Sequence, residues 1–251
     1  RLLTPAEFGI VAFATVAVNW LGVLKDLGLG GAVIQRRDDT EEAAQTAYVL
    51  NLVVSALLTA GTALAAPAVA AFFREPLVVP ILRVLSFTFL IQALGAIHVV
   101  LLRRNLDFRR KLVPDVGQAL AKGIASIAFA VAGFGVWSLV WGQLIGALVC
   151  SVLAWTVIPW RPRFHLHRRL VGPLMRFGGP LLVTDIETAI WSNLDYVIVG
   201  RLLGDAALGV YTLAYRLPEM LVLSVWRVRG NAVFPFFSSI QRFPDLLRRW
   251  F

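Results

Sequence analysis

Residues 136–158 read VWSLVWGQLIGALVCSVLAWTVI, and no charged side chain interrupts this stretch. An α-helix needs about 20 mostly apolar residues to cross the hydrocarbon core of a bilayer, so this run is long enough to do so. A cluster of arginines that begins at Arg161 follows it directly. Because basic residues anchor the ends of such helices at the membrane surface, the pattern predicts a spanning helix.

Similar apolar runs lie on both sides of this stretch. They cover residues 8–24, 43–66, 81–102, 113–134 and 178–200, and a weaker run at 209–228 is interrupted by Arg216, Pro218 and Glu219. The chain is 58% hydrophobic and 16% charged, with a mean hydropathy of +0.74. Soluble domains are about 45–50% apolar and about 25% charged. The sequence therefore predicts an all-α polytopic membrane protein with seven transmembrane helices.

Basic residues are divided unequally between the connections at the two ends of these helices. One end carries three of them, Arg1, Arg74 and Arg201. The other end carries eighteen: Lys25, Arg36, Arg37, Arg103, Arg104, Arg109, Arg110, Lys111, Arg161, Arg163, Arg168, Arg169, Arg176, Arg227, Arg229, Arg242, Arg248 and Arg249. Because lysine and arginine are retained on the cytoplasmic side, the second set predicts the cytoplasmic face. The net charge of +9 thus indicates membrane topology, not a nucleic-acid partner.

The chain contains an internal repeat at an offset of 200 residues. RLLTPAEFG at 1–9 aligns with RLLGDAALG at 201–209, and ten of the first 34 positions are identical without a gap. An even number of predicted spanning segments separates the copies, so both copies face the same side. This pattern predicts a parallel repeat of two halves, an arrangement that alternating-access transporters use.

The repeat also predicts how the chain divides. The chain begins with Arg1, not methionine, and ends directly after a basic stretch, so we expect a piece of a longer protein. Residues 1–200 would hold helices two to six of an N-terminal half and, at about 178–200, the first helix of a C-terminal half. Residues 201–251 would hold helix eight and the cytoplasmic segment after it. The whole protein would then have at least twelve helices.

Three basic residues inside the predicted helices are candidates for binding a substrate in a central cavity, because charge at membrane depth is costly and usually functional. Lys122 lies about 13 Å into its helix, near the middle of a core about 30 Å thick, where it could hold a pyrophosphate. Arg216 lies about 10 Å into the last helix, beside Pro218 and Glu219. Arg83 lies two residues into its helix. The alternatives are ion pairs with carboxylates for Lys122 and Arg216, and an interfacial position for Arg83.

The helix at 178–200 carries three carboxylates, Asp185, Glu187 and Asp195. Glu187, Trp191 and Asp195 are spaced four residues apart, so they share one face, which we expect to point into the bundle. These carboxylates could bind protons or sodium ions as the coupling step of a transporter. The alternative is that they form hydrogen bonds between helices and ion pairs with Lys122 or Arg216.

Other reactive residues do not form a site that the sequence can identify. His165 and His167 lie in a basic loop with no third metal ligand nearby, and Cys150 lies within an apolar run. The glycines at 28, 30 and 31 do not form a nucleotide-binding motif, because no strand precedes them. The sequence predicts no cofactor, no metal site and no catalytic residues, and therefore a protein that is not an enzyme.

Several motifs resemble those of bacterial polysaccharide flippases of the multidrug/oligosaccharidyl-lipid/polysaccharide exporter superfamily. They are RLLTPAEFG at 1–9, DLGLGGAVIQ at 26–35, LDFRR at 106–110, GFGVWSL at 133–139, RFGGPL at 176–181, SNLDY at 192–196, GRLLG at 200–204 and YTLAYRL at 211–217. The resemblance implies a multi-pass protein of the bacterial inner membrane. It would move undecaprenyl-pyrophosphate-linked oligosaccharide from the cytoplasmic to the periplasmic leaflet. Expected partners are this lipid, the bilayer, H⁺ or Na⁺ as coupling ion, and polysaccharide polymerase or export machinery.

The leading interpretation is a flippase in which two six-helix halves rock around a central cationic cavity. An ion-coupled multidrug exporter and a peptidoglycan-precursor flippase are the alternatives within the superfamily, and the sign of the cavity charge would separate a drug exporter from a flippase. A membrane-embedded transferase would need a large loop domain, whereas every connection here is short. A non-transporting scaffold of a polysaccharide export complex is the alternative of another class.

Overall fold

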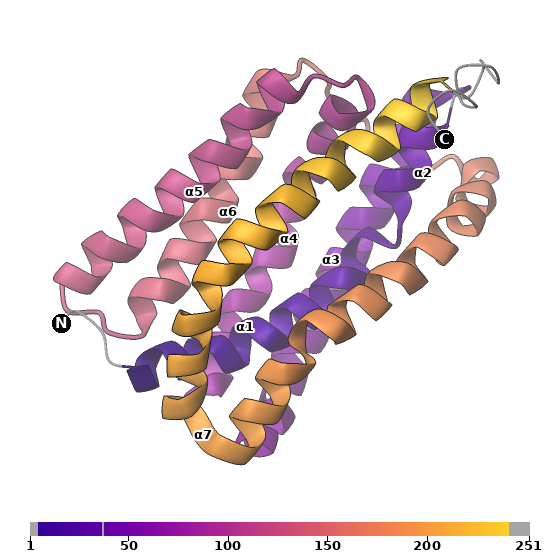
Figure 1. Cartoon of the computed structure of the whole chain (residues 1–251). Coiled ribbons are helices and arrows are strands. Elements are labelled where there is room, and N and C mark those ends of the chain that lie inside the picture. The colour runs from indigo at the N-terminus through magenta and orange to yellow at the C-terminus, as the bar shows by residue number, and fades with distance from the viewer. Residues whose placement is uncertain (1–4, 37, 241–251) are drawn as a thin grey trace.

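The computed structural model describes the backbone of residues 5–36 and 38–240 and the side chains of residues 7–36 and 38–215. Within these ranges the protein is helical and contains no strand (Figure 1). The helices are α1 (Pro5–Asp26), α2 (Leu29–Gln35), α3 (Thr40–Phe73), α4 (Val78–Arg104), α5 (Phe108–Val131), α6 (Trp137–Val157) and α7 (Arg168–Ile240). The prediction of an all-α polytopic fold is confirmed.

Each of the seven predicted apolar runs falls on a helix. Among the described residues, five segments are long and apolar enough to cross a membrane, and they lie in α1 with α2, α3, α4, α6 and α7. Helix α5 is not one of the five, because Asp115, Gln118 and Lys122 interrupt its apolar sequence. These polar residues distinguish the composition of α5 from that of the other helices. They indicate that one face of α5 is not turned toward lipid.

The structure differs from the prediction most in α7. Residues 168–177 and 201–208, which we expected to be connections, are helical except at Gly204. Gly204 has φ 85° and ψ −175°, a conformation that is essentially restricted to glycine, and the helix reverses its direction there (Figure 1). The two arms of α7, 168–203 and 205–240, therefore correspond to the two predicted runs at 178–200 and 209–228.

A second sharp turn separates α1 from α2. Leu27 and Gly28 both have positive φ, at 48° and 68°, and together they end α1. A Cβ atom on Gly28 would overlap the backbone carbonyl of Gly178, so the turn and the first arm of α7 are in close backbone contact. Only glycine at position 28 permits both the left-handed conformation and this close approach.

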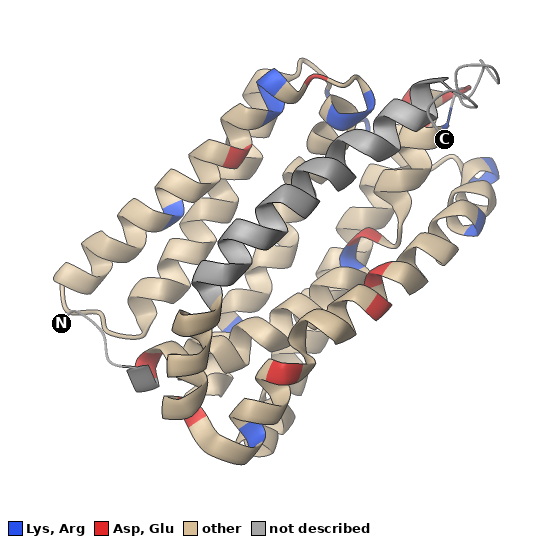
Figure 2. Ribbon diagram, in the orientation of Figure 1, with Lys and Arg blue, Asp and Glu red and all other residues tan. Residues whose placement is uncertain are grey.

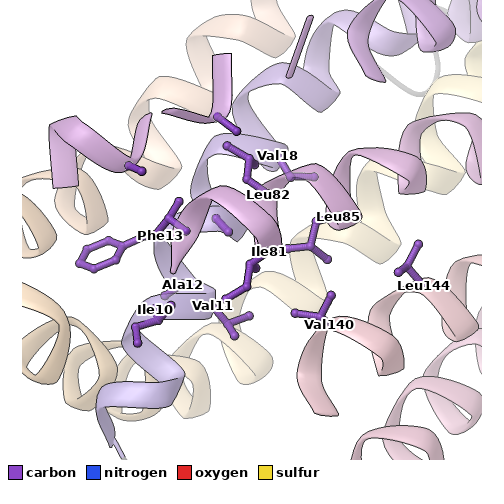
Figure 3. Close-up of a cluster of buried hydrophobic side chains, with 14 of the residues drawn as sticks. Ile10, Val11, Ala12, Phe13, Val18, Ile81, Leu82, Leu85, Val140 and Leu144 are labelled. Atoms are coloured by element: carbon purple, nitrogen blue, oxygen red, sulfur yellow. The ribbon is translucent and has the colours of Figure 1, made fainter. Parts of the chain in front are cut away.

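Two clusters of buried apolar residues hold the helices together at opposite ends. The outer cluster joins α1, α3, α4, α6 and the second arm of α7 (Figure 3) and consists of Ile10, Val11, Ala12, Phe13, Ala14, Val18, Ala66, Ala70, Val78, Ile81, Leu82, Leu85, Phe89, Val140, Leu144 and Leu208. The cytoplasmic cluster joins α2, α3, α4 and the start of α7 and consists of Leu29, Ala32, Val33, Ala43, Ala44, Ala47, Tyr48, Ile97, Val100, Leu101, Leu170 and Leu174.

The arrangement of charges and directions agrees with the predicted topology. Figure 2 shows lysines and arginines gathered at the end of the bundle where α5 and α7 begin, which is the predicted cytoplasmic end. Helix α1 and the second arm of α7, the two copies of the repeat, both start at the opposite end and run in the same direction (Figure 1). This common direction is what an even number of intervening segments predicts.

Candidate transport cavity

A half-open cavity of about 1110 Å³ lies between the helices, lined by α1, α4, α5, α6 and α7. Helices α5 and α6 pack against each other, and we call them the α5–α6 wall. Helix α6 also packs against α4. Helices α1 and α7 pack along each other and form the α1–α7 wall. Pockets for drug-sized molecules measure about 300–1,000 Å³, so this cavity could hold a headgroup of more than one sugar ring.

Helix α5 presents polar residues to the cavity and apolar residues to the outside of the bundle. Asp115, Gln118 and Lys122 share one face and line the cavity, because residues three or four apart lie above one another on a helix. Leu120 and Ile124 are 59% and 67% exposed on another face, which is apolar. The helix is thus amphipathic within the membrane, as expected for the wall of a polar cavity.

Charges of both signs line the cavity. Among the described residues they are three cations, Lys25, Arg103 and Lys122, and three carboxylates, Asp26, Asp115 and Asp185. The prediction of a cationic cavity is therefore wrong for this part of the protein, since the charges balance. The reason is that Asp26 at the end of α1 and two aspartates within helices, Asp115 of α5 and Asp185 of α7, line the cavity along with the expected lysines and arginines. The sign of the lining consequently does not separate a flippase from a drug exporter.

The charged residues of α1 at the cytoplasmic end of the cavity are held by hydrogen bonds. The ammonium of Lys25 donates to Oε1 of Gln92 over 2.8 Å. The carboxylate of Asp26 accepts from the backbone N–H of Gly30 over 3.2 Å and from Nδ2 of Asn51 over 3.4 Å. Asp185 lies close enough to Asp26 for their charges to interact. Both carboxylates line the cavity, and their like charges repel each other.

Lys122 is half-buried in the cavity lining, as its depth in the sequence suggested. Two glycines of α6 determine how closely the helices approach at this point. A Cβ on Gly146 would lie 2.9 Å from Cβ of Lys122, and one on Gly142 would lie 2.9 Å from the Lys122 carbonyl oxygen. Small residues at a membrane helix interface allow such close packing, and here they fix the backbone that presents Lys122.

The other two basic candidates lie elsewhere. Arg83 is exposed on α4, donates from Nε to the carbonyl of Ala63 over 3.4 Å, and is not among the residues that line the cavity. Arg216 belongs to the second arm of α7, but its side chain lies outside the described residues.

The structure separates the three carboxylates of α7. Asp185 lines the cavity and Glu187 does not, although both residues are exposed. Trp191, on the predicted polar face, is 79% exposed, so that face does not point into the described bundle. Asp195 connects the two arms of α7, because its Oδ2 accepts from the hydroxyl of Tyr211 over 2.6 Å. Its other oxygen, Oδ1, is buried without a hydrogen-bond partner in the described part of the chain.

A neighbouring face of α7 lines the cavity instead, and of its residues only Asp185 was a candidate from the sequence. Its residues are Asp185, Thr188, Ala189, Ser192, Asn193 and Tyr196, joined by Thr212 from the second arm. They recur at helical spacing, so the signal was present in the sequence. It was less visible than the face with Glu187 because most of its polar residues are uncharged.

Comparisons with known proteins agree with this fold and site. A protein-family model described as "Polysaccharide biosynthesis protein" matches residues 1–251. Teichuronic acid biosynthesis protein TuaB of Bacillus subtilis is 28% identical over 91% of this chain and 48% of its own length. Succinoglycan biosynthesis transport protein ExoT of Rhizobium meliloti is 28% identical over 96% and 49%. Lipopolysaccharide biosynthesis protein WzxC of Escherichia coli is 24% identical over 99% and 51%.

The chain spans about half the length of these curated relatives. Among solved structures, a multidrug resistance MATE family transporter of the MOP superfamily in an inward-facing conformation shares the fold. The TM-score is 0.68 at 18% identity, over 95% of this chain and 63% of that one. The apolar helices and these relatives make the chain part of a multi-pass membrane protein, for which a bacterial inner membrane fits. With a family model matched over its whole length, the chain belongs to the polysaccharide biosynthesis protein family.

Proposed function

We propose that this chain is part of an alternating-access flippase for undecaprenyl-pyrophosphate-linked oligosaccharide, which it moves from the cytoplasmic to the periplasmic leaflet. The observation that carries the proposal is a polar cavity of about 1110 Å³ between membrane-spanning helices in a chain of this family. A headgroup of sugars and phosphates cannot cross hydrocarbon without partners for its polar groups, and such a cavity supplies them.

The lining suggests how the cargo would be held. Lys122 can pair with the pyrophosphate, because its ammonium lines the cavity and carries the opposite charge. The lipid chains would remain in the bilayer beside the apolar face of α5, where Leu120 and Ile124 are exposed. Release on the other side would require the outer cluster to separate while the cytoplasmic end closes.

We further propose that a proton or sodium ion binds between Asp185 and Asp26 and couples its movement to that of the cargo. Their proximity supports this role, because two neighbouring carboxylates repel each other and favour a bound cation. Asp185→Asn should abolish the ion dependence of flipping in liposomes. Glu187→Gln should leave it unchanged, because Glu187 does not line the cavity. Retention of ion dependence in Asp185→Asn would remove Asp185 from the coupling site.

The division into halves is part of the same proposal. We place the boundary before α7, so that its two arms begin a C-terminal half and helices α1 to α6 belong to an N-terminal one. Glu187 supports this division, because a carboxylate exposed on a spanning helix is costly in lipid and needs further helices to cover it. Polysaccharide polymerase or export machinery would receive the flipped cargo.

The test uses the full-length protein in a strain that lacks it. Lys122→Ala should abolish surface polysaccharide and lead to accumulation of lipid-linked oligosaccharide in the inner leaflet, at a normal level of inserted protein. Lys122→Arg should retain export, and Arg83→Ala is the matched control because Arg83 lies outside the cavity. Normal export by Lys122→Ala would show that this lysine is structural.

The balanced lining also leaves room for one competing function, the export of cationic compounds, for which three carboxylates are available. The same strains separate the two functions. A drug exporter would change the sensitivity of the cells to cationic dyes and leave the surface polysaccharide intact, which is the opposite of the result expected here.

A further inference from the structure

The face of α7 that lines the cavity differs in chemistry from the α5–α6 wall. It carries Thr188, Asn193 and Tyr196 from the first arm and Thr212 from the second arm. These four residues, which we call the α7 face, are uncharged, and Asp185 is the one charged residue beside them in the described part of the α7 lining. They lie on a different wall from Lys122, since α7 packs against α1 and Lys122 belongs to α5.

The hydrogen bonds of the α7 face leave mainly acceptors for a ligand. The hydroxyl of Thr188 donates to the carbonyl of Thr184 over 2.8 Å, and that of Thr212 donates to Leu208 over 2.7 Å. Nδ2 of Asn193 donates to the carbonyl of Ala189 over 2.8 Å. A hydroxyl has one donor and two acceptor lone pairs, so each threonine keeps only acceptor capacity, whereas Asn193 keeps its carbonyl oxygen and one N–H donor.

An acceptor-rich surface discriminates between the two parts of a sugar-phosphate headgroup. Pyrophosphate offers only acceptors and a negative charge, so it gains nothing from oxygen lone pairs. Sugar hydroxyls are donors and can form hydrogen bonds to each of these oxygens. The ring of Tyr196 adds an aromatic surface on which the C–H face of a sugar ring can pack.

Contacts between the two arms hold this aromatic surface in place. The ring of Tyr196 lies 5.4 Å from that of Tyr211 and 6.2 Å from that of Tyr215, measured between ring centroids. Tyr211 is itself bonded to Asp195 on the first arm. The bend at Gly204 therefore brings Tyr196 and Thr212 together, although 16 residues separate them in the sequence.

We infer that the α7 face is the sugar-binding wall of the cavity and that the cargo lies across it, with neutral sugars on α7 and the anionic group toward Lys122. This inference rests on the proposed function, because it assumes a cargo that contains both groups. It assigns to Thr188, Asn193, Tyr196 and Thr212 a role in recognising the glycan.

The test measures binding to the full-length protein in nanodiscs with two probes. One is the repeat-unit oligosaccharide released from the host's own lipid carrier, and the other is inorganic pyrophosphate. Thr188→Val with Thr212→Val keeps the shape of both side chains and should weaken oligosaccharide binding at least tenfold, with pyrophosphate binding changed less than twofold. Lys122→Ala should give the reverse pattern.

Three further variants separate a loss of binding contacts from a change in the structure. Thr184→Val is the matched control, because Thr184 donates to Pro180 in the same way but does not line the cavity, and it should bind both probes normally. Tyr196→Leu should weaken oligosaccharide binding, and Tyr196→Phe should restore most of it. Normal oligosaccharide binding by the double valine variant, or equal loss of both probes, overturns the sugar wall. Binding of neither probe by the wild type overturns the proposed function instead.

Discussion

The outer and cytoplasmic ends of the bundle are held together differently. The outer cluster draws buried residues from α1, α3, α4, α6 and α7, so apolar packing joins helices of both walls there. The cytoplasmic cluster contains no buried residue from α5 or α6 among those that the structure describes. The cavity extends from residues of the outer cluster, Val11 and Ala12, to the end where the two walls are not joined by a common core. The difference teaches that packing closes one end of the bundle, while the other end can accept polar cargo.

The polar contacts of the cytoplasmic end support the same distinction. Nε1 of Trp160 donates to Oε1 and Oε2 of Glu41 over 3.0 and 3.1 Å, and Arg169 pairs with Glu42 and Asp39. Such exposed contacts contribute little stability and can be exchanged for water at small cost. An end held in this way can rearrange more easily than one held by a packed core.

The largest effect is expected where α1 meets the bend of α7 at the outer end. A Cβ on Gly9 would overlap the backbone carbonyl of Asp205, and backbone cannot yield as a side chain can. Gly9→Leu should destabilise the folded protein by about 3 kcal/mol, measured by thermal unfolding in detergent. Gly61→Leu is the control, because a Cβ at Gly61 meets no atom within 4 Å. Equal losses in the two variants would contradict a close-packed outer end.

A smaller effect is expected at the bend itself. Gly204 has open space around a built Cβ, so a substitution there acts through backbone strain alone. Gly204→Ala should cost about 2 kcal/mol because φ of 85° with ψ of −175° is unfavourable for alanine. Gly179→Ala, with similar space and a helical backbone, should be neutral or slightly stabilising. Unfolding curves that coincide for the two variants would mean that the bend carries no strain.

The smallest effect is expected at the cytoplasmic end. Trp160→Phe removes one hydrogen-bond donor to Glu41 and should reduce the free energy of unfolding by about 1 kcal/mol. Glu41→Gln keeps an acceptor and should cost less. If Trp160→Phe destabilised the protein as strongly as Gly9→Leu, the two ends would not differ as described.

Much of the fold could be predicted from hydropathy and loop charge. Each apolar run lies on a helix, because a helix satisfies the backbone N–H and C=O groups of about 20 residues within the segment itself, where a bilayer offers no water. The reversal at Gly204 could not be predicted, because a single glycine is compatible with an uninterrupted membrane helix. Only the backbone angles distinguish the two cases. The helical residues 168–177 were missed because their three arginines resemble a cytoplasmic loop.

The site was less predictable than the fold. The depth of Lys122 identified a cavity-lining residue, and Asp185 was also selected from its sequence position. The face of α7 that lines the cavity was missed, because charge drew attention to Glu187 and the rotation of a helix depends on what it packs against. Tyr196 and Thr212 meet only through the bend. Their pairing follows from tertiary structure and leaves no local signal in the sequence.

The most direct test of the central claim is whether the cavity beside α5 is open to water and occupied by cargo. Gln118 lines the cavity and Leu120, two residues on, is 59% exposed on the apolar face. Each is replaced by cysteine in a full-length protein without other cysteines, and labelling with a membrane-impermeant maleimide is measured in proteoliposomes. We predict that Gln118→Cys is labelled, that lipid-linked oligosaccharide in the same vesicles protects it, and that Leu120→Cys is not labelled. Equal labelling at both positions, or no protection by the cargo, would contradict the account.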